Sequence, residues 1–204
     1  NNLKTAITNK LSYNSFDFIS NLGLKSNLGF NLLNLNSIGK KIPQYKNSPQ
    51  IEFATLFNAD LSLPLKKEDD VYKNFLTPKL SFRFNPSDMK DYSTSENKID
   101  ANNVFTMNRL GLSDTLEAGR SMTLGLNYKK EKIDNLNDIN NYFEIKLATV
   151  IRDKEQNFIP NKSSLQRKNS NLFGSVTNKF SNNLDIGYNF SIDNDYSTFK
   201  YNDL

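Results

Sequence analysis

The chain of 204 residues contains no cysteine and no histidine. Without cysteine there is no disulfide framework, no thiol nucleophile and no cysteine zinc site. Without histidine the chain lacks the usual general base, the Ser–His arrangement and the HExxH metal motif. An enzyme would have to work with carboxylates, lysine or tyrosine alone, so we expect neither enzymatic activity nor a bound cofactor.

Long apolar runs and clusters of like charge are also missing. No apolar run reaches the length of about 18 residues that a membrane-spanning helix needs. The formal net charge is only +4, and the lysines are interleaved with Asp and Glu. Because nucleic-acid binding requires basic residues clustered on one face, no nucleic-acid partner is expected.

Aromatic residues are abundant, although tryptophan is absent. The chain has 15 Phe and 9 Tyr, and aromatic residues make up 12% of it. Its hydrophobic share of 37% lies below the roughly 45–50% of a typical domain. So many aromatic residues argue against disorder, and the low apolar share suits a fold in which half of each element faces water.

The dominant hydrophobic period is two residues. Between Ile51 and Leu65 the odd positions are mostly apolar and the even positions mostly polar, with Ala54 and Leu56 as exceptions. The same alternation recurs at 76–84, 122–128, 143–152 and 184–192, and more weakly at 3–13, 22–32 and 172–180. This pattern predicts an all-β chain of about eight to ten long antiparallel strands, the last beginning at Phe199, with no helix.

Two architectures produce this alternation. A soluble β-sandwich buries its apolar faces between two sheets, whereas a transmembrane β-barrel turns them toward lipid and encloses a polar lumen. Long strands, aromatic residues at strand ends and long polar loops at 85–103 and 153–170 that alternate with short turns favour the barrel. The pattern alone leaves the sandwich open.

Residues 103–128 read NVFTMNRLGLSDTLEAGRSMTLGLNY. This segment resembles the N-L-F … N-R-F-x-G-x-D-R-x-E-x-G-x-R … G-L-x-Y run of the LptD family, the outer-membrane proteins of lipopolysaccharide (LPS) assembly. The matching residues are Asn103, Phe105, Asn108, Arg109, Gly111, Asp114, Glu117, Gly119, Arg120, Gly125, Leu126 and Tyr128. Leu110 stands where the family usually has an aromatic residue, and Thr115 where Arg follows the Asp.

Two further segments, 160–193 and 75–86, also resemble the family, so the resemblance covers roughly 75–204. Ser164 stands where the family usually has Gly, and Asn171 where Asp is common. The resemblance implies an incomplete segment of a transmembrane β-barrel, a curved sheet. Residues 1–204 are then part of a single outer-membrane barrel domain, an internal piece without the N-terminal periplasmic domain and the C-terminal strands.

The resemblance also implies a function. The protein would be the cell outer-membrane component of the LPS transport machine, inserting LPS into the outer leaflet without bond chemistry. Its expected partners are LPS, the lipid bilayer, a companion lipoprotein plug (LptE-like) and a periplasmic bridge protein (LptA-like). A passive outer-membrane pore and a soluble β-sandwich binding module remain as alternatives.

The charged motif within 103–120 has a structural interpretation under the barrel hypothesis. We expect Arg109 and Arg120 to pair with Asp114 and Glu117, because a guanidinium can bind a carboxylate in a bidentate manner. Tight backbone paths at the two motif glycines would complete the loop. The full motif set is Asn108, Arg109, Gly111, Asp114, Glu117, Gly119 and Arg120. The alternative is a solvated surface loop with incidental charges.

A second set of charged residues falls on the polar side of the predicted strands and would face the lumen. These candidates are Lys79, Arg83, Glu144, Lys146 and Arg152. They could line a wet route for the phosphorylated sugar head of LPS, as the family role implies. The simpler interpretation, which we favour, is that they satisfy one another across strands.

Overall fold

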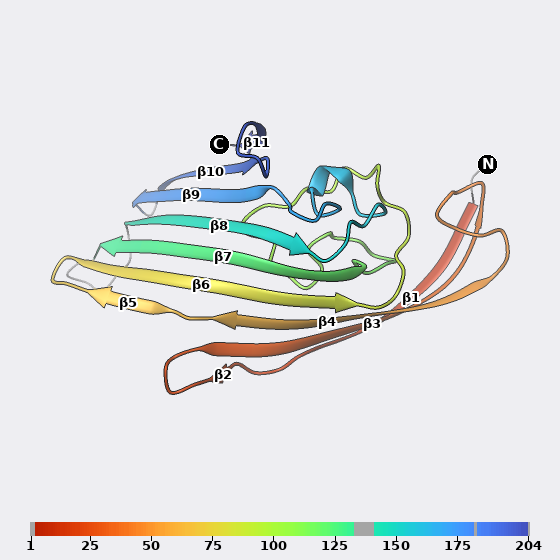
Figure 1. Cartoon of the computed structure of the whole chain (residues 1–204), viewed down its shortest axis with the longest axis horizontal. Helices are drawn as coiled ribbons and strands as arrows, with labels where there is room; N and C mark the ends of the chain where they lie inside the picture. The colour runs from red at the N-terminus through yellow and green to blue at the C-terminus, as the bar shows by residue number, and fades with distance from the viewer. Residues whose placement is uncertain (1–2, 133–140, 182, 204) are drawn as a thin grey trace.

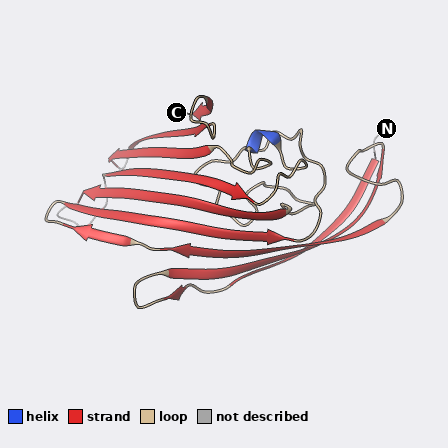
Figure 2. Cartoon of the chain, viewed as in Figure 1, coloured by secondary structure: helices blue, strands red, loops and turns tan. Residues whose placement is uncertain are grey.

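The computed structural model of the chain describes residues 3–132, 141–181 and 183–203. These residues form one antiparallel sheet of 11 strands, and their only helical element is a short 3-10 turn, η1 (Asn161–Ser163) (Figures 1 and 2). The strands are β1 (Leu3–Asn14), β2 (Phe18–Ile19), β3 (Lys25–Lys40), β4 (Gln50–Ser62), β5 (Leu65–Glu68), β6 (Tyr72–Asn85), β7 (Gly119–Lys132), β8 (Tyr142–Arg152), β9 (Leu172–Ser181), β10 (Leu184–Ile192) and β11 (Phe199–Asp203). No helix in this described part of the chain is long and apolar enough to cross a membrane.

The strand order is β1-β3-β4-β6-β7-β8-β9-β10-β11, with β2 paired to β3 and β5 paired to β6. The long path is a simple meander, because each strand pairs with the next long strand along the chain. The sheet is curved and open, with β1 and β11 at its two edges, and β1, β3 and β4 twist away from the other strands (Figure 1). The predicted all-β class and incomplete barrel segment are confirmed.

Alternation of side chains places the apolar set on the outer face of the sheet. Register pairs Phe57 with Phe84, and Leu61 with Leu80, so these side chains share one face. No second sheet covers that face in the described residues, and Phe57 remains 47% exposed. A sandwich of two stacked sheets is therefore excluded for the described part of the chain.

The buried core lies on the inner face, where two loops fold over one end of the sheet. These loops are residues 86–118 and 153–171, and backbone hydrogen bonds from Tyr92 to Phe158 (2.9 Å) and from Asn161 to Ser93 (3.0 Å) join them. One cluster consists of Met89, Ile99, Ala101, Val104, Leu110, Leu112, Ala118, Ala148, Val150, Ile159, Leu165 and Phe173. Burying such apolar side chains, at about 25 cal/mol per Å², is what holds the loops down.

A second core cluster explains the two exceptions to the alternation. Ala54 and Leu56 point inward from β4 and pack with Leu33, Leu35 and Leu116. Leu116 belongs to the loop 86–118, which we call the covering loop. An apolar side chain on the inner face is unfavourable where that face meets water, but it is favourable where a loop covers and buries it. These two residues mark where the loop lies.

The connections differ in length at the two ends of the sheet. The hairpin turns at 20–24 and 69–71 are short, whereas the connections 41–49, 86–118 and 153–171 gather at the opposite end (Figure 1). We refer to these as the short-turn end and the long-loop end. The compact turn 193–198 lies at the long-loop end.

Candidate functional site

A buried ion network joins the covering loop to strands β6 and β8. The Glu117 carboxylate accepts hydrogen bonds from Arg109 Nε at 2.7 Å and from Arg152 Nη1 at 2.5 Å, and Arg83 Nη1 lies 3.7 Å away. Arg83 comes from β6 and Arg152 from β8, while Arg109 and Glu117 belong to the loop. The four side chains, 0 to 6% exposed, form what we call the Glu117 network.

The three guanidiniums also bind the protein around them. Arg109 donates to Thr123 Oγ1 at 2.9 Å and to Ser121 Oγ at 3.0 Å, both on β7. Arg83 donates to the carbonyls of Met107 (3.2 Å) and Thr106, and Arg152 donates to the Ala118 carbonyl. The network therefore fixes both ends of segment 104–118 against the inner face.

Charge balance in the network favours the ionised carboxylate. Burial by itself raises the pKa of Glu117, but the adjacent charges of Arg109, Arg152 and Arg83 outweigh burial and hold the pKa well below its usual range. Three buried cations around one anion make Glu117 the residue on which the whole group depends. Removing a single partner from a buried ion pair leaves an uncompensated charge.

Asp114 forms a second polar cluster nearer the long-loop end. Its carboxylate accepts hydrogen bonds from the hydroxyl of Tyr45 and, at 2.6 Å, from that of Tyr92, and Lys4 Nζ lies 3.5 Å away. Burial raises the pKa of Asp114, yet the two hydroxyl donors and Lys4 bring it below its ordinary value. Burial and the Asp114 contact raise the pKa of both tyrosines. This cluster ties the 41–49 connection and β1 to the covering loop.

The structure separates the motif residues into two groups. The expected Arg109–Glu117 pair is present and buried, which excludes a solvated loop with incidental charges. The expected role of Arg120 is wrong: it pairs in register with Phe84 on the outer face, with its guanidinium 5.1 Å from the Phe84 ring centroid. Pairing of Asp114 with an arginine is also wrong, because Tyr45 and Tyr92 take that place.

The other motif residues shape the backbone of the loop. Gly111 and Gly119 have φ of 66° and 82°, in the left-handed region that glycine adopts without steric cost. Asn108 donates from Nδ2 to the Leu112 carbonyl at 3.0 Å and so closes the turn around Gly111. Sequence reasoning missed Tyr45 and Tyr92, since neither lies in a motif.

The five candidate lumen charges all lie on the inner face but differ in their surroundings. Arg83 and Arg152 belong to the Glu117 network beneath the loop. Glu144 lies 3.4 Å from Lys146, its neighbour along β8, and Lys146 also donates to Asn102 at 3.0 Å. Lys79 is exposed, with Nζ 5.7 Å from the Phe105 ring centroid. Mutual pairing across strands is therefore wrong as a general description, because two of the five bind the loop.

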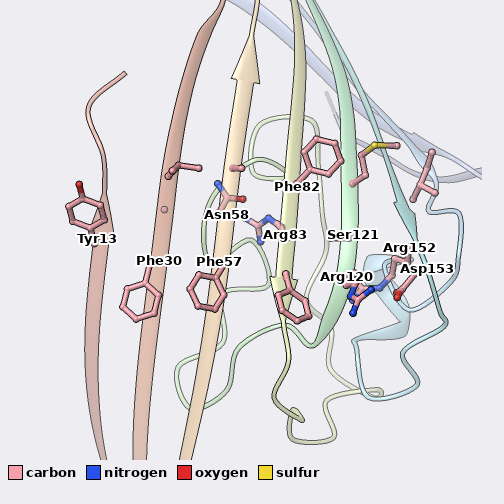
Figure 3. Close-up of a pocket in the computed structure, with 16 residues that line it drawn as sticks. Tyr13, Phe30, Phe57, Asn58, Phe82, Arg83, Arg120, Ser121, Arg152 and Asp153 are labelled. Atoms are coloured by element: carbon pink, nitrogen blue, oxygen red, sulfur yellow. The ribbon is translucent and has the colours of Figure 1, made fainter. Parts of the chain in front are cut away.

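The outer face carries a row of four aromatic side chains and one arginine across five neighbouring strands. Direct register aligns Tyr13, Phe30, Phe57, Phe84 and Arg120, from β1, β3, β4, β6 and β7. The rings of Phe30 and Phe57 are 5.4 Å apart (Figure 3). We call this set the upper aromatic row; it lies toward the long-loop end.

A second belt lies toward the short-turn end. It includes Tyr128 and Tyr188 in one row and Lys130 in the next, with Lys130 Nζ 4.0 Å from the Tyr72 ring centroid. The 10 residue steps from Asn74 to Phe84 along β6 cover about 33 Å, or about 23 Å across a bilayer at a strand tilt of about 45°. Membrane barrels have an apolar band about 25 Å tall between two aromatic girdles.

The chain matches the model of one protein family, LptD, described as LPS transport system D, over residues 49–203. It belongs to the LptD family. A search of curated proteins gives no match. The LptD match spans β4 to β11 and contains the Glu117 network complete, whereas Lys4 and Tyr45 of the Asp114 cluster lie before its first residue.

One departure from the LptD pattern now has a structural explanation. Ser164, where the family usually has Gly, has φ of 59° in the left-handed region. A residue with a Cβ is strained there, which is why glycine suits the position. The Ser164 hydroxyl offsets part of that strain by accepting a hydrogen bond from the Asn171 amide at 3.0 Å.

Proposed function

We propose that this chain is part of the outer-membrane barrel that inserts LPS into the outer leaflet. The observation that carries the proposal is the apolar band of the outer face, in a chain of the LptD family. This band lies between the upper aromatic row and the second belt at the short-turn end. A surface of this height and composition suits acyl chains. The polar inner face would enclose water once further strands complete the barrel at β1 and β11.

The orientation follows from the lengths of the connections. Outer-membrane barrels carry short turns on the periplasmic side and long loops on the external side. The long-loop end would then face outward, and the covering loop 86–118 would close the outer end of the lumen. A lipoprotein plug and a periplasmic bridge would approach from the lumen and from the short-turn end.

The inner face below the loop offers a polar surface for the head of LPS. A cavity of about 210 Å³ lies there, lined by Asp17, Lys25, Asn27, Asp60, Leu61, Ser62, Lys79, Leu80 and Phe105. Lys25 and Lys79 can bind phosphate as point charges, while Asp17 and Asp60 keep the site from holding an anion permanently. Such balanced charge suits a cargo that must pass through.

The test is depletion of the full-length protein from cells, followed by complementation. The proposal expects newly made LPS to disappear from the cell surface on depletion and to return with the wild-type protein. The purified protein should partition into detergent and migrate differently on gels before and after heating. Unchanged surface LPS with altered permeability to small solutes would instead identify a passive pore and contradict the proposal.

A further inference from the structure

The outer face has a groove of about 760 Å³ that centres on the upper aromatic row. Figure 3 shows the rings of Phe30 and Phe57 standing side by side from neighbouring strands, with Arg120 at the far end of the row. The apolar side chains that line it include Leu28, Phe30, Phe57, Phe82, Phe84 and Ile151. Nothing in the proposed export route through the lumen uses this groove.

Arg120 is the feature that sets the groove apart from plain lipid-facing surface. Among the described outer-face positions that pair with Leu80, Phe82 and Phe84, it is the one charged side chain. Its side chain is exposed, and the guanidinium carbon lies 5.1 Å from the Phe84 ring centroid, at the edge of the apolar band. The planar guanidinium of an arginine presents its donors as a fork that matches the oxygens of a phosphate.

The carboxylates around Arg120 do not satisfy it. Asp153 lines the same end of the groove, yet no carboxylate among the described residues lies within ion-pair distance of Arg120. Glu117, the nearest carboxylate in the sequence, is on the opposite face and is held by three other arginines. If the upper aromatic row lies at the boundary between lipid and water, an anionic lipid headgroup is the available partner for Arg120.

We infer that this groove is a binding site for a phosphorylated lipid of the outer leaflet, namely the lipid part of LPS. The phosphate would bind Arg120 at headgroup depth, and the acyl chains would lie over Phe57, Phe82 and Leu28 along the apolar band. A protein segment is a poorer fit, because the groove runs into the face that the bilayer covers. The inference rests on the proposed function for the depth and orientation of the upper aromatic row.

The experiment measures lipid retained by the purified full-length protein in detergent, by native mass spectrometry. The probes are bisphosphorylated lipid A, lipid A with its phosphates removed, and phosphatidylglycerol. Wild-type protein should bind bisphosphorylated lipid A best, and Arg120→Gln should weaken that binding about tenfold, as loss of a charge-assisted hydrogen bond implies. Arg120→Lys should recover part of it, because the charge returns without the fork.

Two matched variants test the position of the charge. Lys130→Gln removes a cation from the same face at the short-turn end and should leave lipid A binding unchanged. Asp153→Asn removes a carboxylate that lines the same groove and would repel a phosphate, so lipid A binding should become stronger. Heat-modifiable migration of each variant shows whether the barrel has folded.

Some outcomes overturn the inference while sparing the proposed function. If folded Arg120→Gln retains wild-type lipid A binding, or phosphatidylglycerol binds equally well, the groove is not an LPS site. In that case cells that carry the Arg120→Gln variant would still deliver LPS to their surface. The export role would instead be overturned if depletion left LPS delivery to the cell surface unchanged, while the purified wild-type protein still bound lipid A.

Discussion

Arg109 and Glu117 form a bidentate pair between two points of one loop, with Nε 2.7 Å from Oε2, and neither side chain is more than 6% exposed. Arg83 and Arg152 reach the same carboxylate from β6 and β8. A loop of more than 30 residues is thus joined to two strands of the inner face through one acidic side chain, in addition to its buried apolar contacts. This relationship leads to the first two predictions.

Glu117→Gln should release the loop 86–118 from the sheet. Three buried guanidiniums would lose their anion, and breaking such a pair costs about 3–5 kcal/mol. Limited proteolysis of the folded protein in detergent should then cut within the loop at a much higher rate. The control is Glu96→Gln in the same loop, since Glu96 is 79% exposed and 3.7 Å from Lys162; its cleavage rate should stay at the wild-type level.

Loop closure should depend on pH in one direction. The folded-state pKa of Glu117 is lowered, so its contribution is complete above the unfolded value of about 4.3 and is lost as pH falls through the folded value. Protease resistance of the loop should be constant from neutral pH to about pH 5 and should fall only in stronger acid. Loss of resistance between pH 8 and 6 would contradict this assignment.

Tyr45→Phe and Tyr92→Phe should each weaken the Asp114 cluster. Each change removes a hydroxyl donor to a buried carboxylate, at a cost of about 1.5–3 kcal/mol. The double variant should cost less than the sum of the two, because both donors serve the same group. Thermal unfolding in detergent measures this. Tyr196→Phe, at a side chain that is 71% exposed, is the control and should have no effect.

Gly125→Ala should disturb the contact between β7 and the loop. A Cβ at this inner position would lie 2.5 Å from Phe105 Cζ, so the ring must move, at a cost of about 1–3 kcal/mol. At Gly187 the nearest atom to a new Cβ is Thr177 Oγ1 at 4.0 Å, so Gly187→Ala should be tolerated. If the two variants were equally stable, the Phe105 ring would not pack against Gly125.

The period of two was enough to predict the strands and their faces. Phe57, Phe84 and Leu124 face outward as the alternation indicated, because successive side chains of a strand point to opposite faces of the sheet. Ala54 and Leu56 broke the pattern for a reason that lay elsewhere in the chain: Leu116 covers them.

The contacts of the loops could not be predicted in the same way. Tyr45 and Asp114 are 69 residues apart and meet through two irregular connections that carry no periodicity. The motif spacing predicts the wrong partner for Arg120, because spacing alone does not reveal that a strand begins at Gly119 and turns Arg120 outward. Motif resemblance identified the residues that matter, and the register of β6 and β7 decided which of them meet.

The central claim is that the outer face of this sheet meets lipid while its inner face meets water. Residues 1–204 contain no cysteine, so Leu124→Cys and Lys79→Cys each add one thiol to this part of the chain, at exposed positions on the two faces. Each variant is made in the full-length protein, with any cysteine elsewhere replaced by serine, and is reconstituted in liposomes. A water-soluble thiol reagent should label Lys79→Cys and spare Leu124→Cys, whereas a probe on Leu124→Cys should be quenched by nitroxide-bearing acyl chains. Rapid aqueous labelling of Leu124→Cys without quenching by lipid would contradict the account.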